Sequence, residues 1–517
     1  MLKFSVLVNG RAPADLDVAH AYLLGPDEEV IRGRVTLRGD LLLCEKRVEG
    51  LAALVIPWSI PDFGRVLLST TLLPEREAPY NLTVELLRGR VVQNWRKKDD
   101  WGYAYTGPTP EFLAGFAEVK KKLAQALSAA TPAAAADLAA QGLQAAVLLG
   151  EDLTLEHAKR GLIYRRTNRE LVDLDFGCRV ELSCRERPYQ ERLFESFNYA
   201  TLPLDWRAIE GREQEFQWRD LDYWVGWLRE KGLAIKAGQV LRFSEATVPD
   251  WLYIWEDDFE SIRDHAFEHV LRCVRRYGPR IEHWDVAAGL NAENCLKFTL
   301  DQIIELTMMS ARVVKKHAPQ ALAVLDVVLP WGEYAAAPPR SISPLKYVEM
   351  CVNTGVEFDA IGLEIFLGAE GYYCRDLLAV SALLDLFGSF GKPVHITAAG
   401  VPSSTLPDAN DAGRGQRDVA VGGVWHRPWD QTVQSEWVDS FYHIAVGKPF
   451  VTSVCWTELS DRPGHLFPHA GLLDAGLKPK GSYAMMLGMK KEIWPEGGLV
   501  EAELPAARPD EQWKEYR

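Results

Sequence analysis

Residues 358–367 read FDAIGLEIFL, and residues 391–403 read GKPVHITAAGVPS. Each stretch contains a short run of aliphatic residues of strand length, and a longer apolar segment of helical length separates the two. A strand, a helix and a second strand in this order are typical of a parallel sheet. The pattern therefore predicts an α/β fold, and its extent follows from the flanking sequence.

The same unit recurs on both sides of these stretches. Amphipathic segments of helical period lie between most of the strands, for example FESIRDHAFEHVLRCVRRYG at 259–278 and TLDQIIELTMMSARVVKKHA at 299–318. The predicted strands are 178–184, 196–202, 233–241, 281–287, 321–329, 358–366, 393–398 and 450–457. Eight strands that alternate with helices predict a (β/α)8 TIM barrel over residues 176–500.

The chain before the barrel divides into two parts. Residues 1–110 are β-rich, with short apolar runs such as AALVIPW at 52–58 and NLTVELLRGRVV at 81–92, and predict a β-sandwich-like domain. Such a domain is either a carbohydrate-binding module or a structural packing domain. Residues 111–175 are rich in alanine and have helical period, so they predict a helical connector. Residues 501–517 form a C-terminal tail.

Composition excludes several functions. The net charge of -14 argues against a nucleic-acid partner and against an anionic membrane. The eight cysteines are scattered singly, so no disulfide framework and no zinc site is expected, and no cofactor motif is present. We expect no apolar run to be long enough to span a bilayer, and the N-terminus lacks a signal-peptide pattern. The expected location is the cytoplasm, or outside the cell if a signal peptide is absent from this sequence.

Several segments, in order, resemble glycoside hydrolase family 10, the xylanase family, over roughly residues 180–495. RRYGPRIEHWDV at 275–286 resembles the family's fourth strand, FDAIGLEIFL its sixth and GKPVHITAAGVPS its seventh. FVTSVCWTELSD at 450–461, followed by GLLDAGLKPKGSYAMM, is similar to its eighth strand and closing segment, and FNYATLPLDWRAIE and KAGQVLRF fit the second and third. The resemblance implies a TIM barrel with a polysaccharide groove at the C-terminal ends of its strands.

The resemblance also shows where this chain departs from the family. The family's acid follows Trp-Asp-Val-Val-Asn, but here Ala288 and Gly289 occupy the places of the asparagine and the acid. The nucleophile follows Ile-Thr, but here Ala398 takes its place. Sugar-binding positions differ as well: Asp205 replaces a lysine, Gln239 a histidine, Glu364 a glutamine and Phe366 a histidine. Neither alanine nor glycine can donate a proton or attack an anomeric carbon.

Other carboxylates lie near the predicted strand ends, where a TIM barrel has its chemistry. Glu293 and Glu364 are the predicted acid and its partner, with Glu333 as the next candidate. The alternatives are that Glu293 is a loop residue, that Glu333 is a surface glutamate beside Trp331 and Tyr334, and that Glu364 is buried and paired with an arginine or lysine. Glu458 follows a strand-end tryptophan and is a further candidate.

Aromatic and polar side chains complete the predicted groove. Thirteen of the 17 tryptophans lie between residues 176 and 500, and sugar rings stack on indole faces, although large core side chains are the alternative. The residues predicted to contact substrate are Trp456, Trp206, Asp205, Gln239, Asp285, Trp331, Trp429, Glu458 and His426.

These features predict a carbohydrate-active protein that hydrolyses a β-linked polysaccharide or oligosaccharide through an unusual catalytic arrangement. One alternative is a glycan-binding protein that has kept the groove and lost the chemistry. Another is a scaffold whose N-terminal region mediates assembly. The sequence leaves the sugar, the stereochemical outcome and the oligomeric state open.

Overall fold

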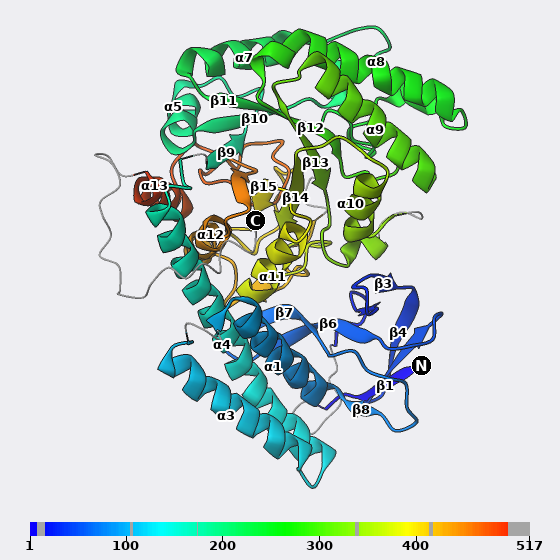
Figure 1. The fold of residues 1–517 in the computed structure, drawn as a ribbon, viewed down its shortest axis with the longest axis vertical. Helices are drawn as coiled ribbons and strands as arrows, with labels where there is room; N and C mark the ends of the chain where they lie inside the picture. Colours follow the sequence, from blue (N-terminus) through cyan, green and yellow to red (C-terminus); the bar gives the residue numbers. More distant parts are fainter. Residues whose placement is uncertain (8–15, 104–106, 173, 337–340, 413–416, 495–517) are drawn as a thin grey trace.

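The computed structural model describes residues 1–7, 16–103, 107–172, 174–336, 341–412 and 417–494. These residues form a closed barrel of parallel strands, preceded by two smaller sheets and several long helices (Figure 1). The predicted tail at 501–517 lies outside the described residues.

The predicted TIM barrel is confirmed. Its strands, in chain order, are β9 (Asp175–Arg179), β10 (Tyr199–Pro203), β11 (Ala234–Gly238), β12 (His283–Ala288), β13 (Leu322–Val327), β14 (Ala360–Phe366), β15 (Val394–Gly400) and β17 (Val451–Trp456), and β17 pairs with β9 to close the barrel. The helices between and after them are α5 (Arg187–Ser196), α6 (Trp206–Ile209), α7 (Arg219–Lys231), α8 (Phe259–Tyr277), α9 (Leu300–His317), α10 (Pro344–Asn353), α11 (Leu377–Gly388), α12 (Gln431–Val446) and α13 (Gly481–Ile493). All eight predicted strands overlap observed ones, although the first begins at Asp175 and not at 178.

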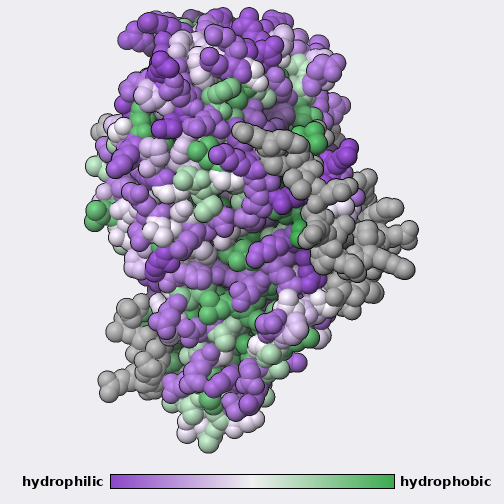
Figure 2. All heavy atoms as spheres, turned by 90° about the vertical axis from the view of Figure 1, so that its left-hand side faces the viewer, coloured by the Kyte–Doolittle hydropathy of each residue, from purple (hydrophilic) through white to green (hydrophobic). Residues whose placement is uncertain are grey.

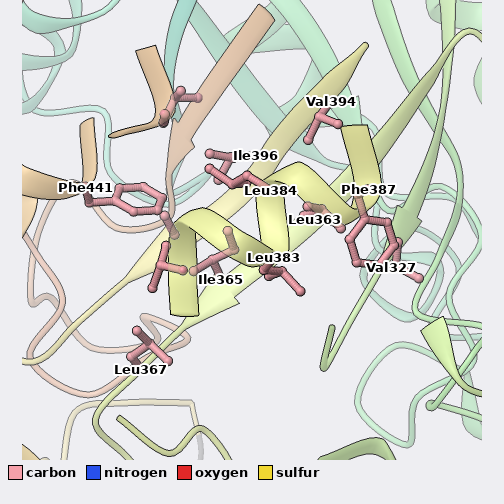
Figure 3. Close-up of a cluster of buried hydrophobic side chains, with 14 of the residues drawn as sticks. Val327, Leu363, Ile365, Leu367, Leu383, Leu384, Phe387, Val394, Ile396 and Phe441 are labelled. Carbon is pink, nitrogen blue, oxygen red and sulfur yellow. The ribbon is translucent and has the colours of Figure 1, made fainter. Parts of the chain in front are cut away.

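Strand β14 shows how alternation divides the core from the site. Leu363 and Ile365 are fully buried and point towards α11, where Leu384 and Phe387 pack in the same cluster (Figure 3). Successive side chains of a strand point to opposite faces, so Glu364, between the two, points into the barrel. The apolar residues of the strand therefore anchor it to its helix and fix the direction of one charged side chain.

The strands of the N-terminal region belong to two separate sheets. One sheet has the order β4 (Gly33–Arg38), β5 (Leu41–Lys46), β1 (Leu2–Ser5) and β8 (Tyr80–Asn81). The other has the order β16 (Val424–Trp425), β7 (Gly64–Ser69), β6 (Ala53–Ile60), β2 (Tyr22–Leu24) and β3 (Val30–Ile31). β16 belongs to the barrel part of the chain, so the second sheet is built from both regions.

The strand expected within 81–92 is wrong, because most of this segment belongs to α1 (Leu82–Asp100). The side chain of Asn81 accepts a hydrogen bond from the backbone N–H of Val84 and caps the helix. Gly89 lets the helix lie directly on β7, since a Cβ there would lie 2.2 Å from the carbonyl oxygen of Ser69. The apolar residues that suggested a strand are those of a helix face.

The predicted helical connector contains α3 (Pro110–Leu127) and α4 (Pro132–Thr167), each of which begins at a proline. α4 packs against α1, α3, α11 and α12, and it runs from the N-terminal region along the barrel (Figure 1). Among the described residues, α4 is the one helix long and apolar enough by composition to cross a membrane, contrary to the expectation from the sequence. Figure 2 shows the face to which these helices contribute, with apolar side chains interspersed among polar ones.

Main-chain pairing joins the N-terminal region to the barrel. β16, in the loop after β15, pairs antiparallel with β7. Beside it, the backbone N–H of Leu67 donates to the carbonyl of Cys374, in the loop after β14, at 2.9 Å. The loops that follow β14 and β15 are therefore hydrogen-bonded to β7 of the N-terminal region.

Buried polar contacts reinforce this junction. Arg90 of α1 forms a double hydrogen bond with Asp376, and both side chains are at most 4% exposed. Glu151 of α4 accepts hydrogen bonds from the indole N–H of Trp425 at 2.8 Å and contacts Nε2 of His426 at 2.7 Å. Such contacts favour a packing role for the N-terminal region, and sugar binding by it stays a prediction.

The buried pair gives a test of this junction. An Arg90→Met variant leaves the Asp376 carboxylate buried without its partner, so the free energy of unfolding should fall by about 3–5 kcal/mol. Urea unfolding measures the change. Arg187→Met is the matched control, since it breaks a pair with Glu191 in which the arginine is 87% exposed, and it should leave the free energy of unfolding almost unchanged. Equal losses in the two variants would contradict the assigned role of Arg90.

Candidate active site

Arg242 joins two of the predicted catalytic carboxylates at the mouth of the barrel. It lies just after β11, and its Nη1 donates to Oε1 of Glu364 on β14 at 2.7 Å. Its Nη2 donates to Oε1 of Glu293, in the loop after β12, at 2.6 Å, and its Nε donates to Oε2 of the same carboxylate. Three loops and strands thus converge on one guanidinium, and the predicted pair Glu293 and Glu364 is brought together.

The electrostatics of this contact are strong. Burial works against the charged form of Arg242, but Glu293 and Glu364 outweigh it and raise the pKa of the guanidinium well above its usual value. Gln239 adds a hydrogen bond from Nε2 to Oε1 of Glu364 at 3.0 Å. Gln239 also has a positive φ of 60°, a strained conformation often found at functional sites.

Gly289 makes room for Glu293. It follows β12 with a φ of 69°, and a Cβ on it would lie 3.1 Å from Oε2 of Glu293. A side chain at this position would therefore compete with the Glu293 carboxylate for space. The loss of the family's acid at position 289 stays a prediction. The Glu293 carboxylate lies beside the place that a side chain at this position would occupy.

Below the mouth, the barrel interior is polar. Lys236 and Asp285 lie 3.0 Å apart, and both are almost completely buried. The hydroxyl of Thr397 donates to Asp326. Burial raises the pKa of Asp285, and burial together with Asp285 and Glu364 raises the pKa of Asp326 well above its usual value. Asp285, predicted to contact substrate, instead lies at 2% exposure beneath the mouth.

The other half of the mouth is apolar. Ala398 packs in a cluster with Phe366, Phe467, Ala369 and Ala470, and Tyr372 lies against it. The rings of Phe366 and Phe467 stack with centroids 4.9 Å apart. Ala398 pairs with Glu364 across the β14–β15 ladder, so this cluster lies directly beside the charged half.

A hollow of about 180 Å³ lies next to Glu364 and is lined by the loops after β13 and β14. Glu333 and Trp331 reach it from the first loop, and Arg375 from the second. Nη2 of Arg375 lies 2.7 Å from Oε1 of Glu333, and the guanidinium also covers the ring of Trp331 at 4.3 Å. Glu333 is therefore a buried residue and not the surface glutamate that one reading of the sequence allowed.

Glu458 and Asp205 lie on the opposite side of the mouth, near Arg179. Burial raises the pKa of Glu458 to about 7, although Arg179 and the backbone N–H of Leu466 favour its charged form. Burial also raises the pKa of Asp205, whose carboxylate caps α6 through the backbone N–H of Ala208. Glu458 thus titrates near neutral pH, as a general acid does.

The predicted aromatic contacts divide into two groups. Trp331 borders the hollow. Trp456, Trp206 and Trp429 are at most 3% exposed, and His426 is held by Glu151 at the junction with the N-terminal region. The structure gives the three buried tryptophans no open surface for a sugar, and their predicted contact with substrate is not supported by their placement.

Sequence reasoning missed the basic and N-terminal members of the site. Arg242 and Arg375 follow strands β11 and β14, and neither arginine was among the predicted site residues. Because the loops after the strands form the site of a TIM barrel, the position of these two arginines in the sequence could have indicated them. Tyr22, whose hydroxyl accepts from Nη2 of Arg375 at 3.2 Å, comes from β2, and nothing local in the sequence places it there.

Comparison with known proteins agrees with this barrel. Residues 172–420 match the family model of glycosyl hydrolase family 10. The barrel thus has the predicted resemblance to this family, which supports a glycoside hydrolase-like protein. The matched range contains Glu293, Glu364 and Ala398 but ends before Glu458.

Among solved structures, a GH10 structure from Paenibacillus barcinonensis is 16% identical, covers 62% of this chain and 97% of its own, and has a TM-score of 0.48. An endo-1,4-beta-xylanase from Caldicellulosiruptor owensensis is 14% identical, with 62% and 98% covered and a TM-score of 0.47. Xylanase 10B from Thermotoga maritima is 16% identical, with 63% and 98% covered and a TM-score of 0.47.

The raised pKa of Glu458 predicts a pH dependence of stability. An unfolded glutamate loses its proton near pH 4.3, whereas the folded one keeps it to about pH 7. The stability that this proton contributes is complete below about pH 4.3 and is lost as the pH rises to 7 and beyond. A Glu458→Gln variant lacks this loss, so its unfolding midpoint should rise relative to the unmodified protein between pH 5 and pH 8. Glu256→Gln, at an exposed position, should show a constant difference. A constant difference for Glu458→Gln as well would contradict the assignment.

Proposed function

We propose that the barrel mouth hydrolyses a β-linked oligosaccharide or polysaccharide, with Glu293 as the acid and Glu364 as its partner. The observation that carries the proposal is the convergence of both carboxylates on Arg242 at the C-terminal end of a barrel that matches family 10. Glycoside hydrolysis needs two carboxyl groups that flank the scissile bond. Glu364 lies on β14 and Glu293 in the loop after β12, so the distance between them depends on the barrel and on Arg242.

The two carboxylates differ in access, and this suggests their roles. Glu364 is 4% exposed and accepts from both Arg242 and Gln239, which hold its carboxylate in a fixed position, as a nucleophile or a base requires. Glu293 is 24% exposed. It is the one that can exchange the guanidinium for a sugar oxygen. An acid must carry a proton before it donates one, so the proposal requires Arg242 to leave Glu293 when the sugar binds.

A second candidate is glycan binding without hydrolysis. The observation that favours it is the double hydrogen bond from Arg242 to Glu293, because the guanidinium occupies both carboxyl oxygens that a sugar would otherwise contact. If Arg242 stays in place, the mouth retains aromatic and polar groups for a sugar but has no acid at Glu293. The two candidates differ in what happens to Arg242 on binding.

Conservative substitution of the two glutamates tests the catalytic proposal. With β-1,4-linked xylo- and gluco-oligosaccharides as substrates, Glu364→Gln and Glu293→Gln should each lower kcat/KM by about 10²-fold or more, because each removes a group that handles a proton or attacks carbon. Chromatography of the products gives the rates. Glu370→Gln, an exposed residue in the loop after β14, is the control and should be fully active. Full activity of Glu364→Gln would refute the assignment.

Calorimetry with the same oligosaccharides separates the two candidates. Binding accompanied by product formation supports hydrolysis. Binding with no product after long incubation supports the second candidate. If neither binding nor product is found with any β-linked oligosaccharide, both candidates fail and a role in assembly gains support.

A further inference from the structure

Tyr22 of β2 packs against both loops that line the hollow beside Glu364. Tyr22 of β2 packs so tightly on the loop after β13 that a Cβ on Gly332 would lie 2.2 Å from its ring. Its hydroxyl accepts from Arg375, in the loop after β14. Tyr22 therefore touches both loops that line the hollow.

Further contacts continue this closure along the same edge. The backbone N–H of Val30 donates to the hydroxyl of Tyr334 at 2.9 Å. The rings of His20 and Tyr373 lie 4.4 Å apart. The loops after β13 and β14 thus lie against the N-terminal region, and this packing is the reason to expect that a sugar chain which reaches Glu364 ends there.

Glu333 adds an unused hydrogen-bond acceptor to the hollow. Its side chain is 7% exposed, and Arg375 Nη2 lies 2.7 Å from Oε1. Even so, neither carboxyl oxygen accepts a hydrogen bond of good geometry from any residue that the structure describes. Buried polar groups almost always have such partners, so these oxygens can accept from a further donor such as water or a bound molecule. Sugar hydroxyls are donors of this kind.

The size of the hollow limits what can enter. As the side chains stand, the hollow has no space as wide as a water molecule, whereas ordinary ligand pockets have roughly 300–1,000 Å³. Its walls offer the aromatic side chains Trp331, Phe366 and Tyr372 together with the carboxylates of Glu333 and Glu364. A sugar ring therefore enters only when the side chain of Tyr372 turns aside, because Tyr22 holds Arg375 in place.

We propose that this hollow is the subsite for the terminal sugar of a β-linked chain, so that the site acts on chain ends or short oligosaccharides and not in the interior of a polymer. Glu333 accepts hydrogen bonds from the hydroxyls of that sugar. Tyr22 is a positioning residue that holds Arg375 and the Gly332 loop. This inference rests on the proposed function of the barrel mouth and assigns its substrate class.

Chain length and product pattern test the substrate class. With β-1,4-linked xylo- and gluco-oligosaccharides of two to six units, kcat/KM should stop rising after two or three units, and early products should have one length. The viscosity of a soluble xylan or glucan should fall slowly relative to the release of reducing ends. Rapid loss of viscosity with early products of many lengths would overturn the inference while leaving the proposed hydrolysis intact. If the protein binds sugars without cleaving them, calorimetric affinity replaces kcat/KM, and a continued rise to six units would overturn it.

Two variants test the residues. Glu333→Gln and Tyr22→Phe should raise KM, or the dissociation constant, about tenfold, with kcat changed less than about threefold. Tyr223→Phe is matched to Tyr22→Phe, since its hydroxyl accepts from Gln190 at 2.8 Å and Arg185 covers its ring, on an outer helix. It should change neither constant. Unchanged KM in both Glu333→Gln and Tyr22→Phe would overturn the subsite.

Gly332→Ala gives an independent check, because the added Cβ meets the ring of Tyr22 without changing any polar group. It should raise KM as Tyr22→Phe does. Gly226→Ala in α7, where no atom lies within 4 Å of the added Cβ, is its control. Thermal unfolding of each variant shows whether the fold is retained. Failure of every oligosaccharide to bind or react with the unmodified protein would refute the proposed function itself.

Discussion

The contact of Arg242 with Glu293 and Glu364 is the interaction on which the barrel mouth depends. Two carboxylates that converge in a poorly solvated space repel each other, and one of them must take up a proton unless a cation lies between them. Arg242 supplies that cation and fixes both side chains through donors on different edges of one rigid group. The spacing of the carboxylates is therefore a property of the guanidinium as well as of the strands.

Periodicity predicted the barrel well, because each strand and helix buries a face of regular spacing, as Leu363 and Ile365 show for β14. It placed Glu364 inside the barrel for the same reason. It misread the segment at 81–92, where the leucines fit a helix face as well as a strand and only the capping by Asn81 and the close approach at Gly89 decide the outcome. Local pattern cannot distinguish these cases when tertiary packing determines the choice.

The site was harder to predict for a related reason. Glu293 and Glu364 could be named because they stand at strand ends, but their common partner and the depth of Glu333 depend on contacts between distant segments. Tyr22 and Arg375 are 353 positions apart and meet at 3.2 Å. Trp456 shows the converse: its place matches a family position, yet its indole N–H donates to the carbonyl of Ala470 and its ring is buried. A motif fixes the place of a residue in a fold but not its exposure.

The apolar half of the mouth limits which charges the site can hold. Ala398 is surrounded by Phe366 and Phe467 and pairs in register with Glu364. A glutamate at this position would place a third carboxylate beside Glu364 and Asp326 and against aromatic rings, so its charged form would be disfavoured by burial and by repulsion together. The aromatic cluster therefore keeps charged groups out of one side of the mouth. On the other side, Arg242 holds the carboxylates of Glu293 and Glu364 in place.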